Sequence, residues 1–184
     1  MWYFSSISFG ILILFGSCSD LPTANNRQRD ELAIRMERKG CYGECPIYVL
    51  NIQSDGKVVF EGKGYTDVIG TAESRITQLQ LDELLKELRN ADVFGLRDSY
   101  ETGADGCPTE ATDMPTVILD VRLNGQEKNI SHYHGCLEIS EPGPVEPGTV
   151  RQAERLRSYP MKLTRFEERI DEIVGTKQWI GERK

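Results

Sequence analysis

The stretch CYGECPIYVLNIQSDGKVVFEGKG, residues 41–64, places two cysteines directly in front of an alternating pattern of apolar residues. Such alternation, with a period of two residues, is typical of a strand with one buried face, and a short turn containing glycine can join two such strands. Ser54-Asp55-Gly56 supplies this turn. The stretch therefore predicts a β-hairpin that turns five apolar side chains to one side: Tyr48, Leu50, Ile52, Val58 and Phe60.

A third strand and a helix are predicted directly after this hairpin. The segment YTDVIG, residues 65–70, is expected to continue as the strand. Thr77 and Gln80 have the spacing of a capping box, and we expect the helix that follows to end near Asn90. Its apolar residues recur every three or four positions and would pack one helix face on the sheet: Leu81, Leu84, Leu85 and Leu88.

A second hairpin is predicted around Asn124-Gly125, the strongest short hairpin signal in the chain. A two-residue turn there places His132 opposite Val117, on the apolar face of the strand. A last amphipathic helix, closed by Gly175, is predicted from its apolar residues: Leu163, Phe166, Ile170, Ile173 and Val174. The predicted fold class is α+β, an antiparallel sheet built from two β-hairpins with two main amphipathic helices packed on one side.

The first residues, MWYFSSISFGILILFGSCSD, have the features of an export signal. Residues 2–17 carry no charge, and their apolar run is far shorter than the roughly 18 residues that a membrane-spanning helix needs. The residues before Cys18 resemble the lipobox of bacterial lipoproteins, and a plain secretory cleavage nearby is the alternative. The expected organisation is a signal peptide over residues 1–17, a tether over residues 18–30, and a single domain over residues 31–184.

Lipid on Cys18 would anchor the chain to a membrane of the bacterial cell envelope through acyl chains, with the domain outside the cytoplasm. Four cysteines then remain, and an even number in an oxidising compartment predicts two disulfides. The sequence alone allows three pairings, and we favour the one that joins Cys41 to Cys45 and Cys107 to Cys136.

Composition and missing motifs narrow the function. The chain has 29 acidic and 22 basic residues, a net charge of −7, which argues against a nucleic acid partner because phosphates demand a basic face. It lacks the G-x-S-x-G, H-E-x-x-H, P-loop and dinucleotide-binding patterns of the common enzyme classes. We therefore expect no catalytic residues and no cofactor.

Four stretches carry a resemblance to a known family. They are CYGECPIYVLNIQSDGKVVFEGKG, LRNADVFGLRDSY, ATDMPTVILDVRLNGQEKNISHYHGC and RIDEIVGTKQWIG. Together they resemble an uncharacterised bacterial domain of unknown function found in exported proteins and lipoproteins. The resemblance covers most of residues 35–181, and its most specific element is C-x-G-x-C-P-x-Y followed by a D-G hairpin. It implies a fold and a location, with no catalytic residues to transfer.

The motif HYHGC places His132, His134 and Cys136 at a period of two on one strand face. With Cys41 and Cys45 close by, these residue types suit zinc or copper. In the alternative, which we favour, both histidines are semi-buried and hydrogen-bonded, and Cys136 is oxidised and so has no thiolate for a metal. An active redox pair at Cys41 and Cys45 is disfavoured, since catalytic pairs are typically C-x-x-C at the start of a helix.

The remaining candidates have structural interpretations. Asp113 could coordinate an ion but is expected to form a turn. Trp179 is expected to close the core after the last helix, and Tyr42 to be exposed. The charges of Glu31 to Lys39 alternate in sign, which predicts a solvated face.

The favoured function is a non-enzymatic envelope domain stapled by disulfides, with an envelope protein or a glycan as its partner. The alternative is a metal- or thiol-dependent envelope protein that uses His132, His134 and Cys136.

Overall fold

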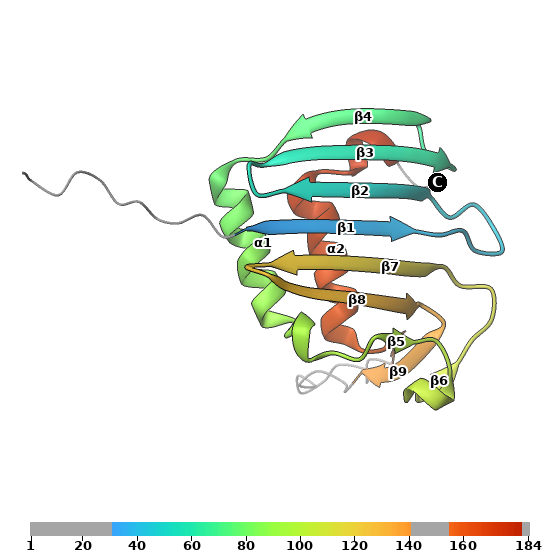
Figure 1. Cartoon of the computed structure of the whole chain (residues 1–184). Helices are drawn as coiled ribbons and strands as arrows, with labels where there is room; N and C mark the ends of the chain where they lie inside the picture. Colours follow the sequence, from blue (N-terminus) through green and yellow to red (C-terminus); the bar gives the residue numbers. More distant parts are fainter. Residues whose placement is uncertain (1–30, 141–154, 182–184) are drawn as a thin grey trace, which may run out of the picture.

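Seven strands form the main sheet of the computed structural model, which describes residues 31–140 and 155–181 (Figure 1). In order across the sheet they are β4 (Gly70–Arg75), β3 (Lys57–Gly64), β2 (Ile47–Gln53), β1 (Leu32–Arg38), β7 (Thr116–Leu123), β8 (Gln126–Tyr133) and β5 (Ser99–Tyr100). Neighbouring strands are antiparallel, except that β5 runs parallel to β8. A smaller antiparallel sheet comprises β10 (Arg155–Ser158), β9 (Cys136–Ser140) and β6 (Thr109–Glu110).

Two long helices cover one face of the main sheet and lie side by side (Figure 1). They are α1 (Gln78–Asn90) and α2 (Met161–Val174), and the short α3 (Lys177–Ile180) follows. Two 3-10 turns, Val93–Gly95 and Gly103–Asp105, complete the described elements. The chain therefore has the predicted α+β class, with a mostly antiparallel sheet. No helix in the described ranges has the length and apolar character needed to cross a membrane.

The strand β1 is the main difference from the sequence-based expectation. It lies at the centre of the sheet, between β2 and β7, whereas the sequence predicted only a solvated face from Glu31 to Lys39 and no strand. Leu32, Ile34 and Met36 are buried under the helices, and the charges between them occupy the uncovered face. The alternation is that of a strand with one polar face, on which Arg35 pairs with Glu37 at 2.6 Å.

Turn chemistry fixes the register of both hairpins. Gly56 has φ +82 in the turn between β2 and β3, and both Asn124 and Gly125 have positive φ between β7 and β8. Val117 therefore lies opposite His132, as predicted. The expected strand at residues 65–70 is wrong in place: Tyr65 adopts φ 52 in a turn, and β4 begins only at Gly70.

Both long helices have the expected ends. Thr77 and Gln80 form the capping box of α1, and Gly175, with φ 75, closes α2. Trp179 is buried and stacks on Phe60 with ring centroids 4.9 Å apart, so it closes the core at the end of α2. These contacts fix α2 over the centre of the sheet.

Two disulfides join the pairs predicted from the sequence. Cys41–Cys45 closes the turn between β1 and β2, whereas Cys107–Cys136 ties the segment after β5 to the start of β9. The first bond spans four positions and the second spans 29. The longer link therefore ties the segment that leads into β6 to the partner strand of β6, β9.

Candidate functional site

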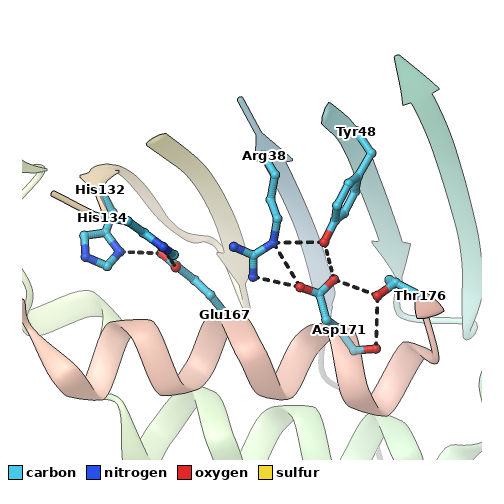
Figure 2. Close-up of polar contacts among 7 residues, drawn as sticks. All are labelled: Arg38, Tyr48, His132, His134, Glu167, Asp171 and Thr176. Carbon is cyan, nitrogen blue, oxygen red and sulfur yellow. Dashed lines mark hydrogen bonds and ion pairs between the residues drawn. The ribbon is translucent and has the colours of Figure 1, made fainter. Parts of the chain in front are cut away.

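Two acidic residues of α2 point toward the sheet, although the rest of that helix face is apolar (Figure 2). Glu167 and Asp171 are four residues apart and therefore lie on the same side of the helix. Each meets polar side chains from the sheet. We name the two resulting groups the histidine cluster, which comprises His132, His134 and Glu167, and the arginine cluster, which comprises Arg38, Tyr48, Asp171 and Thr176.

In the histidine cluster one carboxylate binds both imidazoles. His132 Nδ1 lies 2.7 Å from Glu167 Oε1, and His134 Nε2 lies 2.7 Å from Glu167 Oε2. His132 and Glu167 have no exposed side-chain surface, whereas the His134 side chain is 15% exposed. The cluster is thus closed on the side of His132 and opens to solvent at His134.

The backbone of Tyr159 determines which proton His132 holds. His132 Nε2 lies 3.1 Å from the Tyr159 carbonyl oxygen, which can only accept, so Nε2 carries a hydrogen and donates it. A second proton must then lie between His132 Nδ1 and Glu167 Oε1, because otherwise two lone pairs would face each other at 2.7 Å. The cluster therefore consists of two imidazoles and one carboxylate, joined by hydrogen bonds.

Burial by itself raises the pKa of Glu167. The positive charge of His132 and the hydrogen bonds from both histidines outweigh burial, and together they lower the pKa of Glu167 to about 2. Glu167 is therefore a carboxylate at neutral pH. A buried carboxylate is costly unless it is paired, and the two imidazoles supply that pairing.

The arginine cluster fixes α2 to β1 and β2. Arg38 Nη2 donates to Asp171 Oδ2 at 2.7 Å, and the Tyr48 hydroxyl donates to Asp171 Oδ1 at 2.6 Å. Thr176 Oγ1 donates to the same Oδ1 at 3.0 Å. Burial alone would lower the pKa of Arg38, but the negative charge of Asp171 raises it above its ordinary value. Burial also raises the pKa of Tyr48, so this hydroxyl remains a hydrogen-bond donor.

A pocket of about 670 Å³ brings parts of both clusters to solvent. Its wall contains Arg38 and Asp171 from one cluster and His134 from the other. Cys45 and Pro46 of the disulfide turn also line it. A larger hollow of about 930 Å³ lies between α1 and α2, but neither cluster contributes its polar groups there. Of these two, the 670 Å³ pocket is therefore the better candidate for a binding site, because polar groups of both clusters line it.

The predicted site residues separate into two groups. His132 and His134 come together, but Glu167 completes their cluster, whereas the Cys136 sulfur is bonded to Cys107 and offers no thiolate. Cys41 and Cys45 are likewise bonded to each other. Cys18, the predicted signal peptide and the predicted tether lie outside the described residues.

The minor candidates lie where their structural interpretations place them. Asp113 occupies a turn with φ 68, and its carbonyl oxygen accepts a hydrogen bond from the Tyr42 backbone. Tyr42 itself is exposed. Five polar residues of the clusters were not predicted as site residues: Arg38, Tyr48, Glu167, Asp171 and Thr176. For Glu167 a signal exists, since it is a charge between Leu163, Phe166 and Ile170 within an apolar stripe.

Comparison with known proteins agrees with the family resemblance. Residues 32–174 match the family model of a domain of unknown function, DUF6438. A search of curated proteins finds no match. The matched residues include every member of the histidine cluster, and all but Thr176 of the arginine cluster.

Proposed function

The chain belongs to the DUF6438 family of domains of unknown function, and from this premise we propose that it is an exported, lipid-anchored envelope protein that binds a polar ligand. The binding site is the pocket beside the Cys41–Cys45 turn. Two disulfides support export, because such bonds persist mainly in oxidising compartments. The uncharged apolar start of the chain and Cys18 support anchoring through lipid.

One observation carries the binding role: the wall of the pocket holds the Arg38–Asp171 ion pair and His134, all fixed by contacts within the protein. Preorganised polar groups in a concave site are what a ligand pocket needs to orient its ligand. Lys39 and Glu168 add charges of both signs at the rim. The ligand that matches this lining carries both charge signs or many hydroxyl and amide groups, as a short peptide or an amino-sugar glycan of the envelope does.

A titration followed by NMR tests the binding role. Isotope-labelled protein is mixed with a panel of short peptides and a panel of amino-sugar oligosaccharides. At least one of the two ligand panels should cause saturable shifts of backbone resonances. We expect these shifts at Lys39, at His134 and at the residues on either side of Pro46. Lys39→Ala should weaken this binding, whereas Lys86→Ala, which changes an exposed lysine lining the hollow between the helices, should not. Shifts outside the pocket, or none, would contradict the proposal.

A further inference from the structure

The histidine cluster has the composition and placement of a metal site. His132 lies on β8 and His134 in the turn that directly follows it, and Glu167 approaches both from α2 (Figure 2). One donor atom from each residue can be chosen so that all three lie within 4.8 Å of one another. Imidazole nitrogen and carboxylate oxygen are ligands that zinc and related divalent ions accept.

The hydrogen bond to Tyr159 prepares His132 for such a role. Histidines that bind metals almost always donate their second ring N–H to a carbonyl or carboxylate, which fixes the tautomer. His132 Nε2 makes this bond with the Tyr159 carbonyl, and its Nδ1 therefore points at Glu167. Two imidazoles converge on Glu167, one at each carboxylate oxygen, so three potential metal ligands already lie in contact.

We propose that His132, His134 and Glu167 form a binding site for a divalent transition metal ion, whose open coordination position faces the pocket through His134. The ion would take the place of the protons that now bridge the three groups. Contacts of 2.7 Å must open, and donor atoms up to 4.8 Å apart must approach, to about 3.3 Å, the ligand spacing of a tetrahedral zinc ion. These changes include an opening of the Glu167 contacts. Rotation of the Glu167 side chain and of the partly exposed His134 can supply this opening.

Three protein ligands leave a fourth position vacant on a tetrahedral ion, as in zinc sites that bind water or substrate. His134 lines the pocket, so this position would be accessible from solvent, while His132 and Glu167 remain covered. The site differs from the set of His132, His134 and Cys136 because Cys136 is held in a disulfide. It also stands apart from the organic ligand proposed for the pocket, since no organic group is needed to hold the ion.

Zinc binding by the oxidised full-length protein tests the site. A Cys18→Ser background removes the one cysteine that neither disulfide uses, so thiolates cannot bind the added metal. Protein treated with EDTA and then desalted receives ZnCl₂ at one equivalent. We expect about one retained zinc per chain by mass spectrometry, and a rise of several degrees in melting temperature if free zinc exceeds Kd about 100-fold.

His134→Ala is the main variant, because His134 is partly exposed and its loss leaves His132 paired with Glu167. Glu167→Gln is the second variant. Each should lose the retained zinc and the temperature rise, whereas Asp82→Asn, which changes an exposed acid of α1 away from the pocket, should keep both. Co²⁺ should give a visible absorption band in the wild type that His134→Ala abolishes. Absence of zinc binding in the wild type, or equal binding by both cluster variants, would overturn the proposal.

Discussion

Arg38 of β1 and Asp171 of α2 form an ion pair of 2.7 Å across the interface between sheet and helix, 133 residues apart in the chain. Both side chains are mostly buried, with exposures of 12% and 20%. Arg38 is the next position on the face that carries Leu32, Ile34 and Met36, so the strand places a charge at the end of its apolar row. Asp171 of α2 neutralises that charge.

Arg38→Ala should therefore destabilise the protein strongly. It would leave Asp171 with a hydroxyl from Tyr48 and one from Thr176 but no cation, and a half-removed buried pair costs several kcal/mol. We expect a loss of about 2–4 kcal/mol in the free energy of unfolding by urea denaturation. Arg35→Ala, on the uncovered face of the same strand, should cost about 1 kcal/mol or less. Equal losses would show that Arg38 acts as a surface residue.

His132 should matter more for stability than His134. Replacement of His132 by Ala removes a fully buried ring and leaves the Glu167 carboxylate and the Tyr159 carbonyl each without one partner. In metal-free protein we expect a loss of about 1–3 kcal/mol. His134→Ala should cost less, because solvent can replace its hydrogen bond. Urea denaturation of both variants in EDTA compares them, and a larger loss for His134→Ala would contradict this order.

Glu167 should make metal-free stability sensitive to acid. The fold lowers its pKa from 4.5 to about 2, so the carboxylate stabilises the folded state fully above the unfolded pKa. That contribution is lost as the pH falls from about 5 toward 2, and amounts to roughly 2–3 kcal/mol.

Urea denaturation of wild type and Glu167→Gln at a series of pH values in EDTA checks this dependence. Other carboxylates, such as Glu37, titrate equally in both proteins, so the difference between the two curves isolates Glu167. That difference should shrink between pH 5 and 2. A constant difference would mean that Glu167 does not change its protonation in this range.

The four described cysteines should give no free thiol in exported protein. A thiol titration under denaturing conditions, before and after reduction, measures this directly. Loss of the Cys107–Cys136 bond should cost about 3–4 kcal/mol and loss of Cys41–Cys45 about 2, because the longer loop restricts the unfolded chain more. Two or more free thiols in freshly exported protein would contradict the presence of both disulfides.

Cys18→Ala should abolish membrane anchoring if Cys18 carries lipid. The expected product is an uncleaved or unlipidated precursor that no longer incorporates a labelled fatty acid. Cell fractionation and metabolic labelling report on the two effects separately. Equal labelling of the wild type and the variant would exclude Cys18 as the acylated residue.

Local signals made the hairpins and helix ends predictable. Ser54-Asp55-Gly56 and Asn124-Gly125 determine their turns through residues adjacent in sequence, and Thr77 with Gln80 does the same for α1. The strand β1 was not predicted because the alternating charges of residues 31–39 were interpreted as a solvated face, although apolar residues lie between them. β1 pairs with β7, and the paired residues Arg35 and Asp120 are 85 positions apart in the chain. No local sequence pattern reveals a pairing over such a distance.

The same limit explains the candidate site. The sequence placed His132 on the buried face because the turn fixes its register, and His134 lies two positions further on, just beyond the end of β8. It could not show that α2 would cross that face, so Cys136, near in sequence, seemed a better partner than Glu167, which lies 33 residues beyond His134. Glu167 within its apolar stripe was the one available clue, since a charge at such a position must find a partner.

The central place of β1 has a mechanical consequence for a chain held at its beginning. A pull on the chain ahead of Leu32 acts along the axis of β1, which is hydrogen-bonded to β2 on one side and β7 on the other. Because those bonds run across the strand direction, such a force loads both ladders in shear, and many bonds must break together. A strand at the border of the sheet, pulled from its end outward, would instead peel away one bond at a time. If the proposed lipid on Cys18 holds the chain, tension would therefore enter the domain at a strand that is bonded on both sides.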